Sequence, residues 1–355
     1  MNGATRTMNA TPGEAPVLLR RAGRAGHIVL NRPRAINALN HAMVGLIDEA
    51  LTAYERDDSV ATVVLTGAGE RGLCAGGDIR SIHDDVRAGG RAASAAFWHD
   101  EYRLNARIAR YSKPYVAVMD GIVMGGGVGV SAHGDVRVVT ERSRVAMPET
   151  GIGFVPDVGG TYLLTRAPGE LGTHLALTGS AVGAGDALLC GLADHYVPSA
   201  RLAEFTAALS DLTAADAVRQ YATAPPAGEL AARREWIDHC YAADSVEEIV
   251  ERLHAFGDRH AKEAAETILA KSPTSLKVTL AALRKARELP SLEAVLAQEY
   301  RVSCAALASP DLPEGIRAQV VDKDRAPRWS PAELSQVTDA DVARYFEEPA
   351  VGTSA

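Results

Sequence analysis

Two acidic residues, Glu149 and Asp157, lie in an otherwise apolar segment that glycine and proline interrupt, MPETGIGFVPDVGG (147–160). Carboxylates are rarely buried without a partner or a function. A carboxylate in a dry pocket has a raised pKa, which suits a general acid or base near neutral pH. A structural role stays open for both residues: Glu149 can cap a turn, and Asp157 can begin the helix whose first turn is VGGTY.

Two glycine-rich segments can bring backbone N–H groups close to a ligand. LCAGGDIR (73–80) follows a predicted strand, and GIVMGGGVGVSAHG (121–134) leads from a strand into a helix. Glycine permits close backbone approach, and exposed N–H groups at a helix N-terminus stabilise developing negative charge. Two such loops facing each other would form an oxyanion hole. A packing role stays open, whereas the dinucleotide fingerprint G-x-G-x-x-G fails because Val130 occupies its third glycine position.

Other catalytic patterns are incomplete. The run Gly129-Val-Ser131-Ala-His133 approaches a nucleophile elbow but has His in the last position. Ser131 and His133 lie two residues apart on a predicted helix, so their side chains face apart, and His133 is expected to be a satisfied interior residue. No His-x-x-x-His pair or Cys/His cluster has metal-ligand spacing, so no metal is expected.

The elements that must position these residues alternate through the first half of the chain. Compact apolar runs closed by polar or glycine turns predict strands at 27–32, 61–67, 115–121 and 135–141. Between the first two strands, apolar residues recur at helical spacing from Leu39 to Tyr54, and Asn40 is a plausible N-cap. The order strand, strand, helix repeats, which indicates an α/β core.

The second half of the chain is predicted to be helical. Residues 200–271 are rich in Ala, Glu and Arg, and TAPPAG (223–228) interrupts them as the best internal linker candidate. From Ser272 a helical tail follows, beginning with Ser-Pro and apolar at Leu276, Leu280 and Leu283.

The overall composition limits partners and compartment. The 355 residues carry a net charge of −8, which argues against a nucleic-acid partner. The stretch 115–130 is interrupted by Asp120 and by glycines, so no membrane span is expected. The four cysteines lie far apart, as expected in a reducing compartment. The first fifteen residues lack a secretory or import pattern, and a cytoplasmic location is expected.

Taken together, the two glycine segments and the acidic segment resemble the crotonase (enoyl-CoA hydratase/isomerase) superfamily. CAGGDIR (74–80) and GGGVGVSAHGDVRVVTE (125–141) are similar to its two oxyanion-loop signatures, and PETGIGFVPDVGGTYLLTRAPG (148–169) is similar to its active-site segment. LALTG (175–179) and the turn at 191–194 continue the pattern. The resemblance implies an α/β fold, a spiral of ββα units with a helical C-terminal region.

Within the superfamily the chain most resembles the 3-hydroxyisobutyryl-CoA hydrolase branch. The segments that carry this likeness are HDEYRLN (99–105), MPET (147–150), VPDVGG (155–160), SPTSLKVTL (272–280), QEYRVSC (298–304), EGIRAQVVDKDRAPRW (314–329) and ARYF (343–346). The likeness covers about residues 16–347 and implies a spiral core at 16–200 and a helical region at 201–347. The residues outside it, 1–15 and 348–355, are expected to be disordered tails. It also implies a homo-oligomer, a trimer or a hexamer.

The resemblance implies a role for each matching residue. Gly77 and Gly126 would donate the oxyanion-hole amides. Glu149 would be the catalytic carboxylate, acting as general base or as nucleophile. Asp157 would meet the substrate's hydroxyl group, and Glu101 would line the substrate pocket.

The resemblance also implies where coenzyme A would bind. The backbone around Asp78 and Ile79 would meet the adenine, and Arg34 would approach the phosphates. Coenzyme A is itself an anion, so the net charge of the chain does not exclude it. No cofactor is expected, because coenzyme A is part of the substrate.

One departure from the superfamily pattern indicates the reaction. Its hydratases use two glutamates, the first of them three residues after the second oxyanion glycine, where this chain has Gly129. Where hydratases have a glycine, this chain has Asp157. The resemblance therefore implies hydrolysis of a 3-hydroxyacyl-CoA thioester, most closely 3-hydroxyisobutyryl-CoA in valine breakdown. The alternative is an enoyl-CoA hydratase or isomerase acting on a related acyl-CoA.

Overall fold

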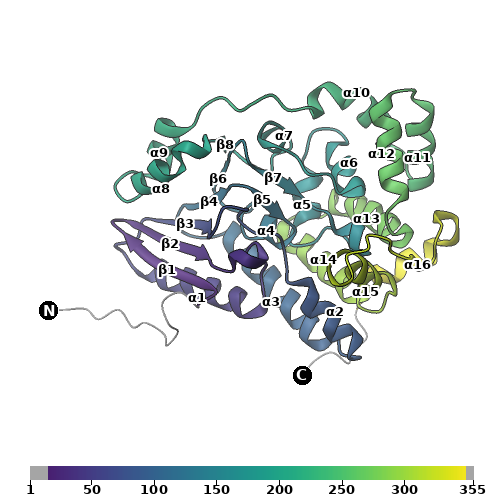
Figure 1. The fold of residues 1–355 in the computed structure, drawn as a ribbon, viewed down its shortest axis with the longest axis horizontal. Coiled ribbons are helices and arrows are strands. Elements are labelled where there is room, and N and C mark those ends of the chain that lie inside the picture. The colour runs from purple at the N-terminus through teal and green to yellow at the C-terminus, as the bar shows by residue number, and fades with distance from the viewer. Residues whose placement is uncertain (1–14, 349–355) are drawn as a thin grey trace.

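The computed structural model describes residues 15–348, and a six-stranded sheet of order β1-β2-β3-β4-β6-β8 lies at its centre (Figure 1). β1 and β2 are antiparallel, and the remaining neighbours are parallel. The strands are β1 (Val17–Ala22), β2 (Ala25–Leu30), β3 (Thr62–Gly67), β4 (Tyr115–Met119), β6 (Val136–Val139) and β8 (His195–Tyr196), while β5 (Ile122–Met124) and β7 (Arg144–Ala146) form a separate parallel pair. The tails predicted to be disordered lie outside the described residues, apart from Ala15 and Glu348.

The four predicted strands are confirmed as β2, β3, β4 and β6, each with its bounds shifted by up to two residues. Four strands were not predicted. β1 is an edge strand whose last four residues are exposed, so it lacks the apolar run of a buried strand. β5, β7 and β8 are only two or three residues long, too short to show a strand pattern in the sequence, and they form because they pair with neighbouring strands.

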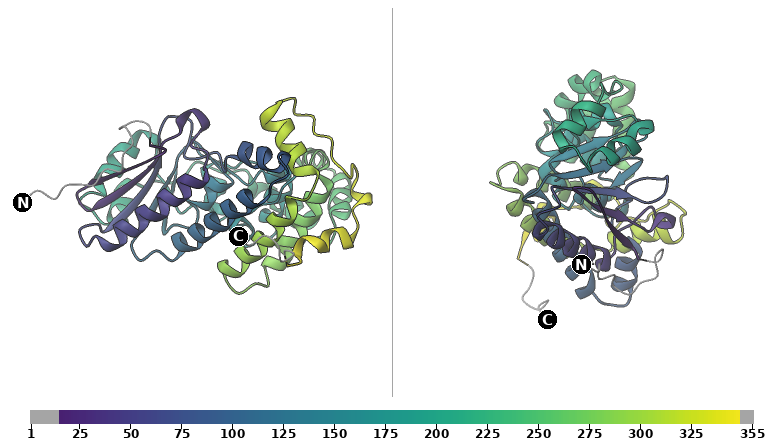
Figure 2. Two further views of the ribbon diagram at one scale, coloured as in Figure 1. Left: turned by 90° about the horizontal axis from the view of Figure 1, so that it is seen from below. Right: turned by 90° about the vertical axis from the view of Figure 1, so that its left-hand side faces the viewer.

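The two faces of the large sheet are covered by different helices. Along β3 the side chains alternate, so Val63 and Leu65 pack into the main core with α1 (His41–Arg56) and α3 (Ala92–Ala109). Val64 points to the other face and joins a smaller core formed by α8 (Leu202–Ala208) and α9 (Ala214–Tyr221). Figure 1 and the left view of Figure 2 show these helices on opposite sides of the strands.

The expected helix after β2 is confirmed as α1. Its N-cap is Asn40, whose side chain accepts a hydrogen bond of 3.0 Å from the Met43 backbone N–H. The predicted apolar face is buried at Met43, Ile47, Leu51 and Tyr54.

The order of the first elements agrees with the expected spiral of ββα units. Strands β1 and β2 lead to α1, β4 and β5 lead to α4 (Gly126–Gly129), and β6 and β7 lead to α5 (Gly160–Leu164). The prediction that a helix carries Ser131 and His133 is wrong, since α4 ends at Gly129 and both residues lie in turns. The glycines allow one tight turn of helix rather than a long one.

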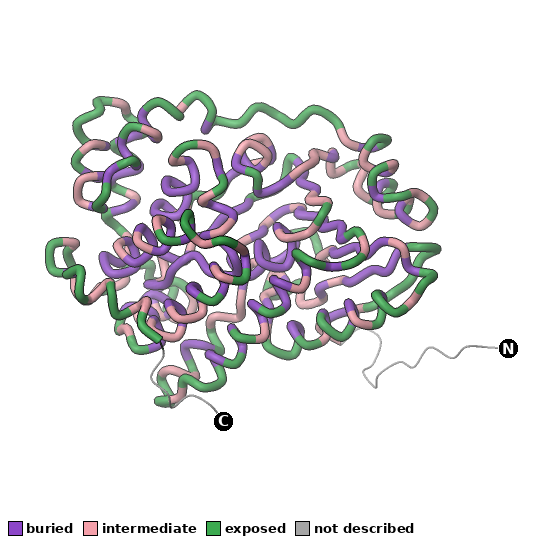
Figure 3. Tube along the Cα trace, turned by 180° about the vertical axis from the view of Figure 1, so that it is seen from behind, coloured by how far each residue is buried: buried purple, intermediate pink, exposed green. Residues whose placement is uncertain are grey.

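Beyond β8 the described residues form helices and no strand. The segment 223–228 is part of an exposed connection between α9 and α10, seen in Figure 3 as a green arch along the top. α14 (Leu292–Ala306) packs against α3 and α5, and α15 (Asp311–Ile316) packs against α2 (Ile79–Arg87) and η2 (Glu149–Ile152), so this region folds over one end of the core. The further helices are α2 (Ile79–Arg87), α6 (Leu171–Thr178), α7 (Ala184–Leu189), α10 (Leu230–Tyr241), α11 (Val246–Ala255), α12 (Arg259–Leu269), α13 (Pro273–Ala286), α14 (Leu292–Ala306), α15 (Asp311–Ile316) and α16 (Asp339–Ala343), with the short turns η1 (Pro33–Ala35), η2 (Glu149–Ile152), η3 (Ser199–Arg201), η4 (Arg317–Val321), η5 (Leu334–Gln336) and η6 (Arg344–Phe346).

Among residues 15–348, no helix combines the length and the apolar character that a membrane span requires. The division at residue 200 into a core and a helical region stays a prediction. One continuous hydrophobic core includes residues from both sides of that boundary, among them Leu65, Leu177, Ile237 and Leu296.

Candidate active site

A cavity of about 310 Å³ lies between the two glycine loops, α3, η2 and the C-terminal helices. Its lining contains six of the eight residues that the sequence analysis singled out for binding or catalysis, and Asp78 and Arg34 are the two that it lacks. Its lining is formed by Ala75, Gly76, Gly77, Ile79, Ile82, Phe97, Trp98, Glu101, Gly125, Gly126, Pro148, Glu149, Gly151, Ile152, Phe154, Asp157, Lys271, Leu312 and Gln319. The stacked rings of Trp98 and Phe154, 5.1 Å apart, form an apolar part of the wall.

Backbone hydrogen bonds to Leu39 hold the first glycine loop in place. Leu39 donates its N–H to the Gly76 carbonyl at 2.8 Å and accepts from the Asp78 N–H at 2.7 Å. Gly76 has φ of +111°, which side-chain-bearing residues rarely adopt. The Gly77 N–H lies between these bonds and has no hydrogen-bond partner among the described residues.

The second glycine loop approaches the first closely. Met124 donates to the Cys74 carbonyl at 3.0 Å, which ties the two loops together before the chain turns at Gly125, where φ is +49°. A Cβ atom added to Gly126 would lie 3.2 Å from the Gly77 nitrogen. Within the described chain the Gly126 N–H also has no hydrogen-bond partner. The structure therefore places two free N–H groups close together on the wall of the cavity, as an oxyanion hole requires. We call Gly76, Gly77, Gly125 and Gly126 the glycine wall.

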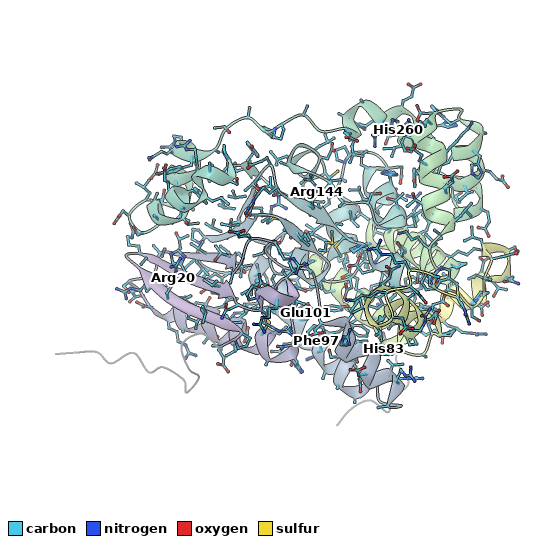
Figure 4. The ribbon with its side chains drawn as sticks, viewed as in Figure 1. Arg20, His83, Phe97, Glu101, Arg144 and His260 are labelled. Carbon is cyan, nitrogen blue, oxygen red and sulfur yellow. The ribbon has the colours of Figure 1, made fainter. Side chains whose placement is uncertain are left out.

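Two buried glutamates lie against the glycine wall. Glu149 Oε1 is 2.8 Å from the position of a Cβ on Gly125, and Glu101 Oε1 is 2.6 Å from that of a Cβ on Gly126. Figure 4 shows Glu101 one turn along α3 from Phe97, another residue of the cavity lining. Burial, and after it the charge of Asp157, raises the pKa of both glutamates well above the usual range.

Asp157 is also buried and is held by α3 and α14. Tyr102 donates its hydroxyl hydrogen to Asp157 Oδ2 at 2.7 Å, and Ser303 lies 2.7 Å from the same hydroxyl oxygen. Burial raises the pKa of Asp157 to about 7, although the Tyr102 bond acts in the opposite direction. Among the described residues, Oδ2 is the carboxylate oxygen that accepts a side-chain hydrogen bond.

The backbone after Asp157 is strained and is held by two further side chains. Val158 has φ of +54°, which is unfavourable for a β-branched residue. Its carbonyl oxygen lies 2.7 Å from His133 Nε2, and because a carbonyl can only accept, that nitrogen carries the hydrogen. Burial lowers the pKa of His133 to about 4, so the ring is neutral at pH 7. His133 is therefore the satisfied histidine that the sequence predicted.

Glu299 of α14 holds the same turn from the other side. Its Oε2 accepts the Gly159 N–H at 2.6 Å, and its Oε1 accepts the N–H and the hydroxyl of Thr161 at 2.9 and 2.6 Å. Burial raises the pKa of Glu299 to about 8, against the effect of these donors. We call Glu101, Glu149, Asp157 and Glu299 the acid cluster, and none of them is more than 6% exposed.

Gly129 lies where no side chain fits. A Cβ added there would lie 2.7 Å from Val158 Cβ and 2.9 Å from Asn105 Nδ2. The space that the first glutamate of a hydratase would need is thus filled by two side chains, and one of them belongs to the strained turn after Asp157.

The residues expected to contact coenzyme A are divided between the cavity and the surface. Ile79 lines the cavity, while Asp78 is half-buried and paired with Arg32 at 2.9 Å. Arg34 is exposed in η1 and does not line the cavity, so its contact with the phosphates stays a prediction. Lys271 is the one cation of the lining and was not singled out from the sequence. Within residues 15–348, no group of three His, Cys, Asp or Glu side chains is arranged to hold a metal ion.

Sequence reasoning missed Tyr102, Glu299 and Ser303. All three lie in the segments 99–105 and 298–304, which carried the family likeness without a role for these side chains. The signal that could have found them is a polar residue on the buried face of an amphipathic helix.

Comparison with known proteins places the chain in a family. The family model described as enoyl-CoA hydratase/isomerase matches residues 25–346. The chain is similar to proteins named 3-hydroxyisobutyryl-CoA hydrolase, mitochondrial, with 43% identity in Rattus norvegicus (94% of this chain and 89% of the relative) and 42% in Xenopus tropicalis (96% and 91%). A solved structure described as a carnitinyl-CoA dehydratase from Mycobacterium thermoresistibile is 55% identical with a TM-score of 0.92, covering 96% of this chain and 98% of that one.

These names correct one expectation and leave two reactions to compare. The cytoplasmic location expected from the sequence is contradicted, because the curated relatives are mitochondrial by name. The expectation rested on the interpretation of residues 1–15 alone. Two of the names describe hydrolysis of a CoA thioester and one describes dehydration of a CoA ester.

Proposed function

We propose, for a chain that belongs to the enoyl-CoA hydratase/isomerase family, that it hydrolyses the thioester of 3-hydroxyisobutyryl-CoA. The products are 3-hydroxyisobutyrate and coenzyme A, which assigns the reaction to valine breakdown. Support comes from the hydrolase relatives, which match 94–96% of the chain at 42–43% identity.

The observation that carries the choice of hydrolysis is the filled space at Gly129. Hydration needs one group to deliver water to the β-carbon and a proton transfer at the α-carbon, and hydratases of the family use two glutamates for this. Here Val158 and Asn105 occupy the place of the first glutamate. Glu149 remains as the one acid at a position that matches a hydratase glutamate, and Asp157 belongs to a different segment of the lining.

In the proposed mechanism the thioester oxygen accepts hydrogen bonds from the N–H groups of Gly77 and Gly126. Glu149 takes a proton from water as the water oxygen bonds to the carbonyl carbon, giving a tetrahedral oxyanion. The oxyanion collapses, the carbon–sulfur bond breaks, and the thiolate of coenzyme A takes the proton from Glu149. Each amide donor stabilises the oxyanion by on the order of 3 kcal/mol.

A second route through the same atoms begins with attack by Glu149 itself. Its carboxylate bonds to the carbonyl carbon, the thiolate leaves, and water then cleaves the resulting anhydride. A single turnover in water labelled with ¹⁸O separates the routes, since only the anhydride route can leave label in the Glu149 carboxylate.

Asp157 selects the substrate in this proposal. Its Oδ1 accepts a hydrogen bond from the 3-hydroxyl group of the acyl chain, while Tyr102 holds Oδ2. An acyl chain without that hydroxyl leaves a buried carboxylate oxygen unpaired, which is costly. The proposal needs no cofactor, because coenzyme A is part of the substrate, and a trimer or hexamer stays a prediction for size measurement in solution.

Two assays on the native protein test the proposed reaction. We expect release of free thiol from 3-hydroxyisobutyryl-CoA and no more than a trace of hydration of crotonyl-CoA. Robust hydration without release of coenzyme A would overturn the proposal and favour the reaction class named for the dehydratase structure. Assays across a panel of acyl-CoA esters then rank the acyl chains.

The reverse experiment, creating a hydratase by Gly129→Glu with Asp157→Gly, is limited by the same geometry. The added side chain would meet Val158 and Asn105 within 3 Å of its first carbon. We therefore expect misfolding or loss of all activity unless both neighbours are also made smaller.

A further inference from the structure

We propose that Glu101 acts as an uncharged carboxylic acid that donates a third hydrogen bond to the thioester oxygen, beside the N–H groups of Gly77 and Gly126. This inference rests on the proposed thioester hydrolysis. It gives Glu101 a catalytic role in place of the general pocket-lining role that the sequence predicted.

The geometry is the first support. The position that a Cβ on Gly126 would take is 2.6 Å from Glu101 Oε1 and 3.2 Å from the Gly77 nitrogen. Oε1 is enclosed and has no hydrogen-bond partner among the described residues. A buried oxygen without a partner costs free energy, so such groups call for an explanation. A substrate oxygen bound at the two amides would give Oε1 its partner.

The charges around Glu101 favour its protonated form. Glu149, Asp157 and Glu299 are the other acids of the cluster, and burial together with the charge of Asp157 raises the pKa of Glu101 well above its usual range. Tyr102 and Cys74 are two further titratable residues near Glu101. Burial raises the pKa of both, so both side chains are neutral.

Among residues 15–348, no cation forms an ion pair with Glu101. Lys271 is the one cation that lines the cavity, and burial lowers its pKa. Arg32 is already paired with Asp78. An ionised Glu101 would therefore stand as a like charge beside Asp157 and Glu149.

The protonation state decides what Glu101 can do. A carboxylate only accepts hydrogen bonds, and it would repel an oxyanion that forms beside it. A neutral carboxyl group has an O–H that can donate, and burial is known to keep a catalytic carboxyl neutral for this purpose in another enzyme. A neutral Glu101 also adds no charge that would oppose ionisation of Glu149, which must act as base or nucleophile.

A matched pair of variants tests the donor. Glu101→Gln keeps a neutral hydrogen-bond donor of similar size, whereas Glu101→Met keeps the size and removes all hydrogen bonding. We expect kcat for 3-hydroxyisobutyryl-CoA to fall less than about tenfold in the Gln variant. In the Met variant it should fall by on the order of 10²-fold or more, the usual effect of losing one oxyanion donor. Equal losses in both variants, or no loss in either, would overturn the proposal.

A pH profile gives a readout that a purely structural residue would not change. After subtraction of spontaneous hydrolysis, native kcat should fall at high pH as Glu101 loses its proton, since its raised pKa keeps the donor form until then. Glu101→Gln cannot lose that proton, so its high-pH limb should disappear. Coincident profiles would also overturn the proposal, even if the Met variant failed to fold.

These outcomes differ from failure of the proposed function. If the native protein releases no coenzyme A from any 3-hydroxyacyl-CoA, thioester hydrolysis itself is wrong, and the inference about Glu101 falls with it. If the native protein hydrolyses the substrate normally but the Gln and Met variants lose equal activity, the proposed function stands and the inference about Glu101 is wrong.

Discussion

The glycine wall and the acid cluster line one cavity but are built in opposite ways. The glycine wall comes from two short segments whose backbones are hydrogen-bonded to each other, and its polar groups are backbone N–H groups. The acid cluster gathers side chains from α3, η2, the segment between η2 and α5, and α14, with Glu299 lying 140 residues from the Gly159 N–H that it binds. The glycine wall therefore depends on the absence of side chains, and the acid cluster depends on burial that raises carboxyl pKa values.

The largest effect should follow from removing the charge of Glu149. Glu149→Gln is nearly isosteric and should keep the fold and ligand binding, yet reduce thioester hydrolysis by at least ~10²-fold. In the native protein the raised pKa means that Glu149 ionises only above the usual carboxyl range. Turnover should therefore be lost as the pH falls through that raised value. Near-normal turnover in the Gln variant, measured by free-thiol release, would contradict the assignment.

The glycine wall should be almost as sensitive to a single methyl group. Gly126→Ala would place a carbon 2.6 Å from Glu101 Oε1 and 3.2 Å from the Gly77 nitrogen, so kcat should fall by on the order of 10²-fold, as for a lost oxyanion donor. Gly45→Ala on α1 is the matched control, because nothing lies within 4 Å of its Cβ position. That control should keep kcat and stabilise the helix by roughly 0.5–1 kcal/mol.

A smaller, selective effect should follow at Asp157. Asp157→Ala should penalise 3-hydroxyacyl-CoA esters about tenfold more than their deoxy analogues, since only the former lose a hydrogen bond to a charged group. Tyr102→Phe is the matched control, because it removes the other partner of Asp157 and leaves the carboxylate facing the cavity. Equal losses across both substrate series would make Asp157 a structural residue of the turn.

The smallest effect on catalysis, and a clear effect on stability, should follow at Glu299. In Glu299→Gln an amide donor must face the N–H of Gly159 or Thr161, which leaves a buried donor unpaired and should cost about 1–3 kcal/mol. Thermal unfolding should show a melting temperature several degrees lower, while Glu204→Gln on the exposed face of α8 should not change it. An unchanged melting temperature would mean that the hydrogen bonds of Glu299 do not stabilise the strained turn at Val158.

The contrast between the two regions also explains what could be predicted. Gly77, Gly126, Glu149 and Asp157 were singled out because they lie in short, glycine-rich segments that carry the family likeness, and all four line the cavity. Glu299, Tyr102 and Ser303 were missed as site residues because helical periodicity marks them only as positions on a buried face. Arg34 was singled out by resemblance alone and lies exposed outside the cavity.

The sequence by itself determined the family, the ββα order and the positions where the backbone needs glycine, because these follow from local patterns of a few residues each. Only the tertiary structure decided the protonation of the acid cluster and the closure of the space at Gly129. Burial beside other carboxyls raises the pKa of each acid, and that burial arises from helices far apart in the chain. In the same way, whether a side chain fits at Gly129 depends on Val158 and Asn105, which reach it from a turn and a helix elsewhere in the fold.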